Sequence, residues 1–296
     1  MLIGITVSAI FCAFTVFTAV KSSAQVDDAS LQEIRDLLDR SELETAESML
    51  ENLLQDNADS AELLLLQGMV FLQRVDEVSL IRKLGYSRRG RQALEQALLL
   101  DPNLVEAKKE LSDYYYYAPA IAGGDQAFAA QLIAEIEPLD EVYYLLARGG
   151  REMESGKLSA ARETFLEALR LDPMSFDVLV ELGVTHRRLQ EYTESRAVLS
   201  RAMVIQPDFV LGYFHLGLIG VASREAPLQA IEQFRKYIEL GGLQAPLRDQ
   251  AWYRIGMLYE MANDKESARF SYNSSLQVNP EFEPAQSALR ELERGL

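Results

Sequence analysis

The stretch "WYRIGMLYEMANDKESARFSYNSSLQVNP", residues 252–280, holds two amphipathic patterns and a stop signal. Trp252, Ile255, Gly256 and Tyr259 fall at the spacing that places side chains on one face of a helix. A second pattern of the same kind follows and closes on proline, which lacks the N–H that a helix interior requires. The stretch therefore predicts two helices joined by a short turn.

The same closing pattern occurs at several places along the chain. "ALEQALLLDP", "TFLEALRLDP" and "AVLSRAMVIQP" end at Pro102, Pro173 and Pro207, and the last two prolines are 34 residues apart. A fixed period of this length is the signature of a repeat architecture. Because no repeat can bury its apolar face alone, consecutive hairpins must stack.

The hairpin at 252–280 resembles the tetratricopeptide repeat. It carries the pattern W-x₂-L-G-x₂-Y, with Ile255 in place of leucine. Ala268, Tyr272 and Pro280 follow where the family has alanine, an aromatic residue and proline. The resemblance implies an all-α fold, a right-handed α-solenoid of about seven helix hairpins with a capping helix at the C-terminus.

Small residues support the same fold. Glycines recur where the first helix of a unit approaches a neighbour, and alanines recur where the second helix presses on the first. We expect irregular repeats over 25–141 and regular repeats with the capping helix over 142–296. The predicted units and the cap cover 27–60, 61–104, 105–141, 142–175, 176–209, 210–244, 245–280 and 281–296. An insertion around "VDEVSLIRKL" enlarges the second unit.

The first residues read as an export signal. No charged residue occurs from Leu2 to Val20, and the small residues of "SSA" (22–24) suit a signal peptidase. Residues 1–24 are therefore predicted to be a signal peptide, which sends the chain to the periplasm or outside the cell. Nineteen apolar residues also reach roughly 28 Å, nearly a bilayer core, so residues 2–20 as an uncleaved inner-membrane anchor remain the alternative.

Charge and cysteine content exclude several classes of partner and site. The formal net charge is −16, which repels nucleic acid phosphate, so no nucleic acid partner is expected. The one basic island, Arg82 to Arg91, is either a solvated helix face or a docking patch for an acidic partner or anionic lipid. Cys12, the only cysteine, lies in the leader, so disulfides and thiolate metal sites are not expected.

No enzyme motif is present, and neither a cofactor nor a metal site is expected. His186 and His215 are the only histidines, and neither has a second ligand at metal-binding spacing. His186 replaces a packing aromatic and is expected to lie between helices. His215 is expected to face the groove.

Function is therefore expected on the concave face, which the first helix of each unit lines. An apolar middle flanked by arginines suits an extended or helical peptide with apolar anchors and a carboxylate. The alternative is that these side chains pack within the superhelix or against a neighbouring subunit; the sequence carries no signal of oligomeric state. The candidate groove residues are Arg187, Arg188, Phe214, His215, Leu218, Tyr253, Arg254 and Met257.

The resemblance to a better-known chaperone-docking subfamily fails on that face. Lys109 stands where that carboxylate clamp has a lysine, but Asp113 stands where it needs an asparagine. The sequence predicts a non-enzymatic protein- or peptide-binding scaffold of the bacterial cell envelope. The alternative is a periplasmic small-molecule binder or transporter accessory protein.

The stretch "YYYYAPAIAGGD", residues 114–125, is the main departure from the repeat pattern. Consecutive helical residues point about 100° apart, so four tyrosines cannot form one wall. Tyr116 and Tyr117 are the two that can face the groove. The rest predicts an enlarged corner, with Asp125 capping the next helix; a loop folded over the groove is the alternative.

Overall fold

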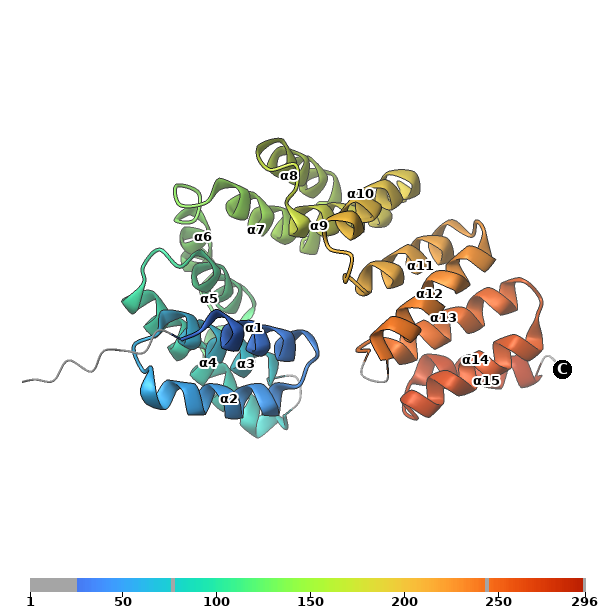
Figure 1. Ribbon diagram of the computed structural model, residues 1–296, viewed down its shortest axis with the longest axis horizontal. Helices are drawn as coiled ribbons and strands as arrows, with labels where there is room; N and C mark the ends of the chain where they lie inside the picture. Colours follow the sequence, from blue (N-terminus) through green and yellow to red (C-terminus); the bar gives the residue numbers. More distant parts are fainter. Residues whose placement is uncertain (1–25, 76–77, 243–244, 295–296) are drawn as a thin grey trace, which may run out of the picture.

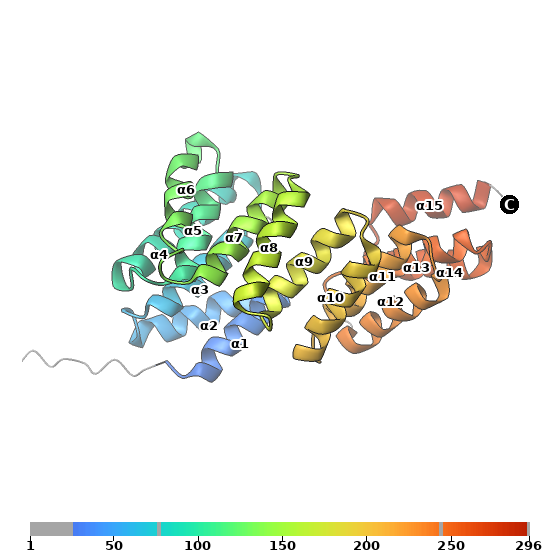
Figure 2. The ribbon, with the colours of Figure 1, turned by 90° about the horizontal axis from the view of Figure 1, so that it is seen from above.

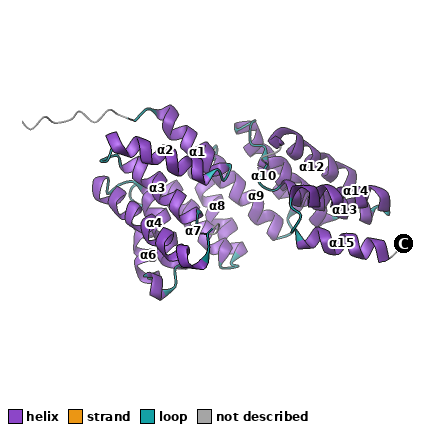
Figure 3. Ribbon diagram, turned by 90° about the horizontal axis from the view of Figure 1, so that it is seen from below, coloured by secondary structure: helices purple, strands orange, loops and turns teal. Residues whose placement is uncertain are grey.

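The computed structural model describes residues 26–75, 78–242 and 245–294. Within these ranges the chain is all-helical, with fifteen α-helices, one 3₁₀ turn and no strand (Figure 3). The helices are α1 (Asp28–Asp39), α2 (Leu43–Asp56), α3 (Ala61–Gln73), α4 (Leu80–Leu100), α5 (Val105–Tyr117), η1 (Ala120–Ala122), α6 (Gln126–Ala134), α7 (Glu141–Glu154), α8 (Leu158–Leu171), α9 (Phe176–Arg188), α10 (Tyr192–Ile205), α11 (Leu211–Ser223), α12 (Pro227–Gly241), α13 (Arg248–Met261), α14 (Lys265–Val278) and α15 (Glu283–Arg294).

The helices pair into seven consecutive hairpins, α1–α2 to α13–α14, and α15 packs on α14 at the end of the array. Figure 1 shows the array bent into an arch, with α7 and α9 on the inner side of the bend and α8 and α10 outside. Figure 2 shows the hairpins following one another from one end to the other. The predicted solenoid with a capping helix is confirmed.

Prolines and short polar turns set the helix ends. Helices α4, α8, α10 and α14 each end two residues before a proline. The residue before a proline is pushed out of the helical region, so the helix must stop there. The second hairpin departs from the others because the predicted insertion lengthens α4 to 21 residues.

In five of the seven hairpins, a bulky side chain of the second helix packs on a glycine of the first helix; the first helices α1 and α5 contain no glycine. A Cβ atom on Gly217 would lie 2.7 Å from the Phe234 ring, and one on Gly183 would lie 2.6 Å from Leu199 Cγ. Gly256 and Tyr272 make the same pair. The close neighbour that requires each glycine is thus the partner helix of its own hairpin.

Two adjacent glycines of α7 give a matched stability test. A Cβ on Gly149 would overlap the buried Phe165 ring, whereas one on Gly150 meets nothing within 4 Å. We expect Gly149→Ala to lower the free energy of unfolding by about 1–3 kcal/mol through overpacking. Gly150→Ala should raise it by about 0.5–1 kcal/mol through helix propensity. Urea unfolding followed by circular dichroism measures both free energies. Equal changes in the two variants would contradict the close packing of the Phe165 ring on Gly149.

The enlarged corner after α5 is confirmed as a structural turn. The Asp125 carboxylate accepts hydrogen bonds from the backbone N–H groups of Ala127 and Phe128, each at 3.0 Å, and so caps α6. Gly123 has φ of +93°, and a Cβ on Gly124 would collide with the Ala118 carbonyl, so both positions need glycine. The 3₁₀ turn packs against α4, a second helix, rather than folding over the inner face.

The predicted leader, residues 1–24, and the alternative anchor, residues 2–20, lie outside the described residues. Among the helices of the described ranges, none combines the length and the apolar composition that a bilayer crossing would require.

Candidate functional site

The candidate site is the inner face of the arch, to which α5, α7, α9, α11 and α13 contribute as first helices of their hairpins. Residues three or four apart on each of these helices share a face, so each helix presents one stripe of side chains to the groove. Two regions of opposite charge lie along this face: an acidic pocket between α5, α7 and α9, and a cluster of arginines carried by α9 and α13.

The acidic pocket has a volume of about 330 Å³. Tyr143 and the aliphatic side chains of α7 form one wall, and α5, α7 and α9 all supply charged groups. Its lining is Lys109, Asp113, Tyr143, Leu146, Ala147, Gly150, Arg151, Met153, Glu154, Asp177 and Glu181. The four carboxylates in this list exceed the cations by two. Among the described residues, no three potential ligand side chains are grouped closely enough to hold a metal ion.

The two cations of the pocket are already neutralised. Lys109 Nζ lies 3.0 Å from Glu110 and 2.9 Å from Asp113. Burial opposes its charge, but these two carboxylates outweigh burial and raise the pKa of Lys109. Arg151 Nη2 lies 3.0 Å from Asp113 Oδ1 and also donates to Ser112 Oγ, which ties α7 to α5.

The remaining carboxylates of the pocket lack such partners. Glu154, Asp177 and Glu181 form no ion pair with any described residue. Burial raises the pKa of all three, and the charges of Asp177 and Glu154 add to the rise at Glu181. Burial also raises the pKa of Tyr143, which keeps its hydroxyl protonated. The pocket therefore presents uncompensated negative charge beside an aromatic ring.

The arginine cluster lies further along the same face. Arg187 and Arg188 end α9, and Arg254 projects from α13. None of the three forms an ion pair with a described residue, and the Nε atoms of Arg187 and Arg254 are buried without a hydrogen-bond partner. Burial, followed by the charges of Arg188 and Arg254, lowers the pKa of Arg187. Three like charges are thus gathered without a counter-ion from the described chain.

His215 on α11 lies beside this cluster as a neutral group. Its Nδ1 atom is buried and has no hydrogen-bond partner. Burial and the Arg187 charge lower its pKa to about 4. At neutral pH the ring therefore contributes polarity to the groove but no charge.

This shift predicts a pH-dependent stability. The unfolded chain takes up a proton on His215 below about pH 6.5, and the folded chain does so only near 4. The free energy of unfolding should fall as the pH drops from about 6.5 to about 4, by up to about 3 kcal/mol. Carboxylates titrate in the same pH range and would mask the effect. The measurement is therefore the difference in the free energy of unfolding between the wild type and His215→Leu, obtained by urea unfolding at pH 7.5 and at pH 4.5. An unchanged difference between the two pH values would contradict the shift.

The predicted groove residues differ in where the structure places them, some in the core and some beside the groove. Phe214 is 4% exposed and packs in the core edge-on to Phe234, with ring centroids 5.4 Å apart. Its assignment as a groove residue is wrong, because the groove side of this turn belongs to His215. Leu218 is partly buried against the same core. Met257 lies beside the arginine cluster, its sulfur 3.4 Å from Arg254 Nη1.

The aromatic candidates lie at the edges of the groove. Tyr253 packs on Tyr272 and on Phe282 next to α15. Tyr116 lines a second hollow, between α6 and α7, where the Arg151 guanidinium lies 4.6 Å from its ring. Tyr117 is 54% exposed and packs edge-on to Tyr116. Neither tyrosine lines the acidic pocket.

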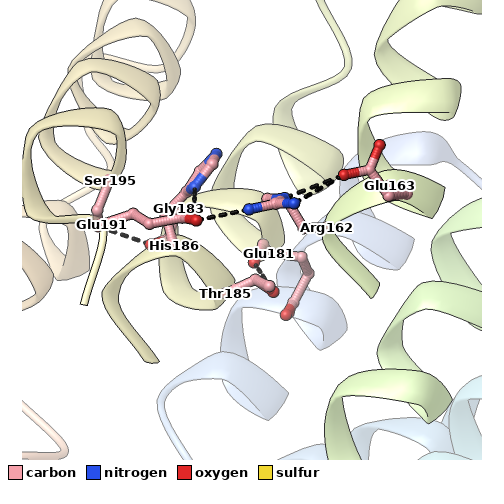
Figure 4. A network of polar contacts seen from close by, with 8 residues as sticks. All are labelled: Arg162, Glu163, Glu181, Gly183, Thr185, His186, Glu191 and Ser195. Atoms are coloured by element: carbon pink, nitrogen blue, oxygen red, sulfur yellow. Dashed lines mark hydrogen bonds and ion pairs between the residues drawn. The ribbon is translucent and has the colours of Figure 1, made fainter. Parts of the chain in front are cut away.

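His186 is confirmed as an interhelical packing residue. Its Nδ1 lies 2.6 Å from the Glu191 carboxylate, which in turn contacts Arg162 of α8 at 2.5 Å. Figure 4 shows this network joining the hairpins on one side of α9, while the Glu181 side chain extends away from it without a partner.

Tyr143 and Glu154 were not among the sequence candidates. Tyr143 stands 34 residues, one repeat period, before Asp177, so the period relates these two positions of the pocket. Glu154 ends its helix, and only the approach of α5 and α9 brings it into the pocket.

Comparisons with known proteins agree with the geometry. Residues 146–208 and 249–282 each match a tetratricopeptide repeat model. The chain therefore contains tetratricopeptide repeats. Repeats of this kind generally mediate protein–protein interaction, which indicates a scaffold for partner proteins.

The individual relatives are distant. Human protein O-mannosyl-transferase TMTC3 is 24% identical over 143 residues, which cover 47% of this chain and 15% of TMTC3. The APC/C hetero-tetramer Cut9–Hcn1 has a similar chain, with a TM-score of 0.63, 16% identity and coverage of 90% of this chain and 49% of that one. Human IFIT1, solved as a dimer with PPP-AAAA, gives a TM-score of 0.66, 15% identity and coverage of 90% and 62%. The chain spans less than two thirds of each, and the structural likenesses show the fold alone.

Proposed function

We propose that the chain is a scaffold that binds a segment of a partner protein in the concave groove. The observation that carries this proposal is the cluster of Arg187, Arg188 and Arg254, which gathers three positive charges on the inner helices without a described counter-ion. Folding such a cluster costs free energy that a bound carboxylate recovers, because charge-assisted hydrogen bonds to arginine are strong. Met257 lies beside it and, together with Leu218 of α11, supplies apolar contacts for the same segment.

Panning a random peptide library against the purified full-length protein tests this function. We expect enrichment of binding peptides, and we expect the variant Arg187→Ala with Arg254→Ala to lose most of their affinity. The control is Arg196→Ala with Arg269→Ala, which removes two exposed arginines from the second helices α10 and α14. No enrichment, or an equal loss in the control variant, would contradict groove binding.

The scaffold is proposed to act in the bacterial cell envelope, periplasmic or secreted after cleavage of residues 1–24. The support is the uncharged stretch from Leu2 to Val20 with small residues at 22–24. Cell fractionation with N-terminal sequencing should find a mature chain that begins at Gln25. A chain that keeps its leader in the membrane fraction would favour the anchored alternative, and a cytosolic chain would contradict both.

A small-molecule binder or transporter accessory is a second candidate, because the acidic pocket is large enough for a compact organic cation. Native mass spectrometry of the purified protein distinguishes the two. A retained ligand would favour this function, and an apo mass without thermal shift across a panel of amines would exclude it.

A further inference from the structure

The two charged regions of the inner face share one helix. Asp177 and Glu181 belong to the first half of α9 and point to the acidic pocket, whereas Arg187 and Arg188 end the same helix. Figure 4 shows that Glu181 is directed away from the polar network that His186 forms on the other side of α9. The groove therefore changes the sign of its charge along α9.

The dipole of α9 does not by itself account for this arrangement. Acids near a helix N-terminus and bases near its C-terminus are favourable, so the dipole could explain the residues of α9 alone. Each region, however, is completed from another helix. Glu154 is the last residue of α7, where the dipole disfavours a negative charge, and Arg254 lies in the middle of α13. Neither position improves the stability of its own helix.

Each region fits a ligand charge of opposite sign. The pocket combines Glu154, Asp177 and Glu181 with the Tyr143 ring, which suits a lysine or arginine side chain through ion pairing and cation–π contact. The arginine cluster adds buried, unpartnered N–H groups of Arg187 and Arg254, which suit a carboxylate. A segment of one charge would meet attraction at one end and repulsion at the other.

The spacing of the two regions sets the spacing of the ligand charges. Asp177 and Arg187 are ten residues apart on α9, a rise of roughly 15 Å. An extended segment covers this distance in about five residues at roughly 3.3 Å per residue.

We propose that the groove selects an extended partner segment of mixed charge, whose basic side chain enters the Tyr143 pocket while its acidic side chain, about five residues away, binds the arginine cluster. This proposal rests on peptide binding in the groove and adds the class of segment that the groove prefers.

Four capped peptides test the charge pattern. The mixed peptide carries Lys-Lys and Glu-Glu separated by four serine and leucine residues, so its inner lysine and inner glutamate are five positions apart. The others carry the same charges with one spacer residue, or only lysines, or only glutamates. Acetylated and amidated ends keep terminal charges out of the comparison. Fluorescence anisotropy with the full-length protein should show the mixed, long-spacer peptide binding at least tenfold more tightly than the other three.

Reversing a charge of the protein tests the same pattern from the other side. If Glu181 had only a structural role, its reversal would not improve binding of a peptide of the opposite charge. Glu181→Lys should weaken binding of the mixed peptide about tenfold and strengthen binding of the all-glutamate peptide. Glu167→Lys, at an exposed position of the outer helix α8, is the matched control and should change neither. Circular dichroism confirms that both variants fold.

Two failures are distinguishable. If library peptides bind but show no mixed-charge pattern, and Glu181→Lys leaves the preference among the four peptides unchanged, this inference is overturned and groove binding stands. If neither library peptides nor designed peptides bind, the proposed function is overturned and this inference with it.

Discussion

Phe234→Ala is expected to lower the free energy of unfolding by about 3–5 kcal/mol, the usual range for truncation of a buried phenylalanine. Phe234 is fully buried, with its ring against Gly217 and edge-on to Phe214. Removing the ring leaves a cavity at the centre of the α11–α12 hairpin, where the rigid helix backbones allow little collapse. Urea unfolding followed by circular dichroism measures the loss.

The effect should extend beyond one hairpin. The core that contains Phe234 also includes Ala251, Ile255 and Leu258 of α13, so the sixth and seventh units share it. Because each repeat is stabilised by its neighbours, loss of this contact weakens the C-terminal end of the array as a whole. Phe270→Ala is the control, since Phe270 is 65% exposed on α14, and it should cost less than about 1 kcal/mol. Similar losses in both variants would contradict the assignment of the core.

The double variant Arg187→Gln with Arg254→Gln is expected to bind the peptides selected from the library about 100-fold more weakly while the folded protein becomes more stable. Each arginine loses a charge-assisted contact with the ligand, and two such contacts are worth about 3 kcal/mol, or about 100-fold in affinity. Stability moves the other way because burial and the neighbouring charges lower the pKa of Arg187, a sign that its charge is disfavoured in the folded state.

Opposite changes in stability and affinity identify a binding site rather than a structural one. Isothermal titration with a peptide selected from the library measures the affinity, and urea unfolding measures the stability. Arg162→Gln supplies the contrast, because Arg162 pairs with Glu191 and Glu163 on the outer side of the array. That variant should keep its affinity and gain no stability. A loss of stability in the double variant would show that the arginines support the fold instead.

Elements with a strong local signal could be predicted from the sequence. The 34-residue period, the glycine of most first helices and the proline after four of the second helices specify a stack of hairpins, because each acts within about one repeat. The corner at 114–125 was predictable for the same reason: Gly123, Gly124 and Asp125 each satisfy a local backbone requirement.

The register of α11 could not be predicted with the same accuracy. Its residues, Leu211–Ser223, are apolar on nearly every side, so the helical period does not show which face is buried. Phe214 and His215 are neighbours that point about 100° apart, and only packing against Phe234 decides that Phe214 enters the core.

The sequence by itself determined the fold: hairpins of two helices, stacked by period, with a groove lined by first helices. Only the tertiary structure decided how the charges meet. Glu154 and Glu181 come from different units, as do Arg187 and Arg254, and local pattern carries no information on distances between helices. Those distances follow from how consecutive hairpins stack, which depends on side chains that pack between units, as in the core shared by the sixth and seventh units.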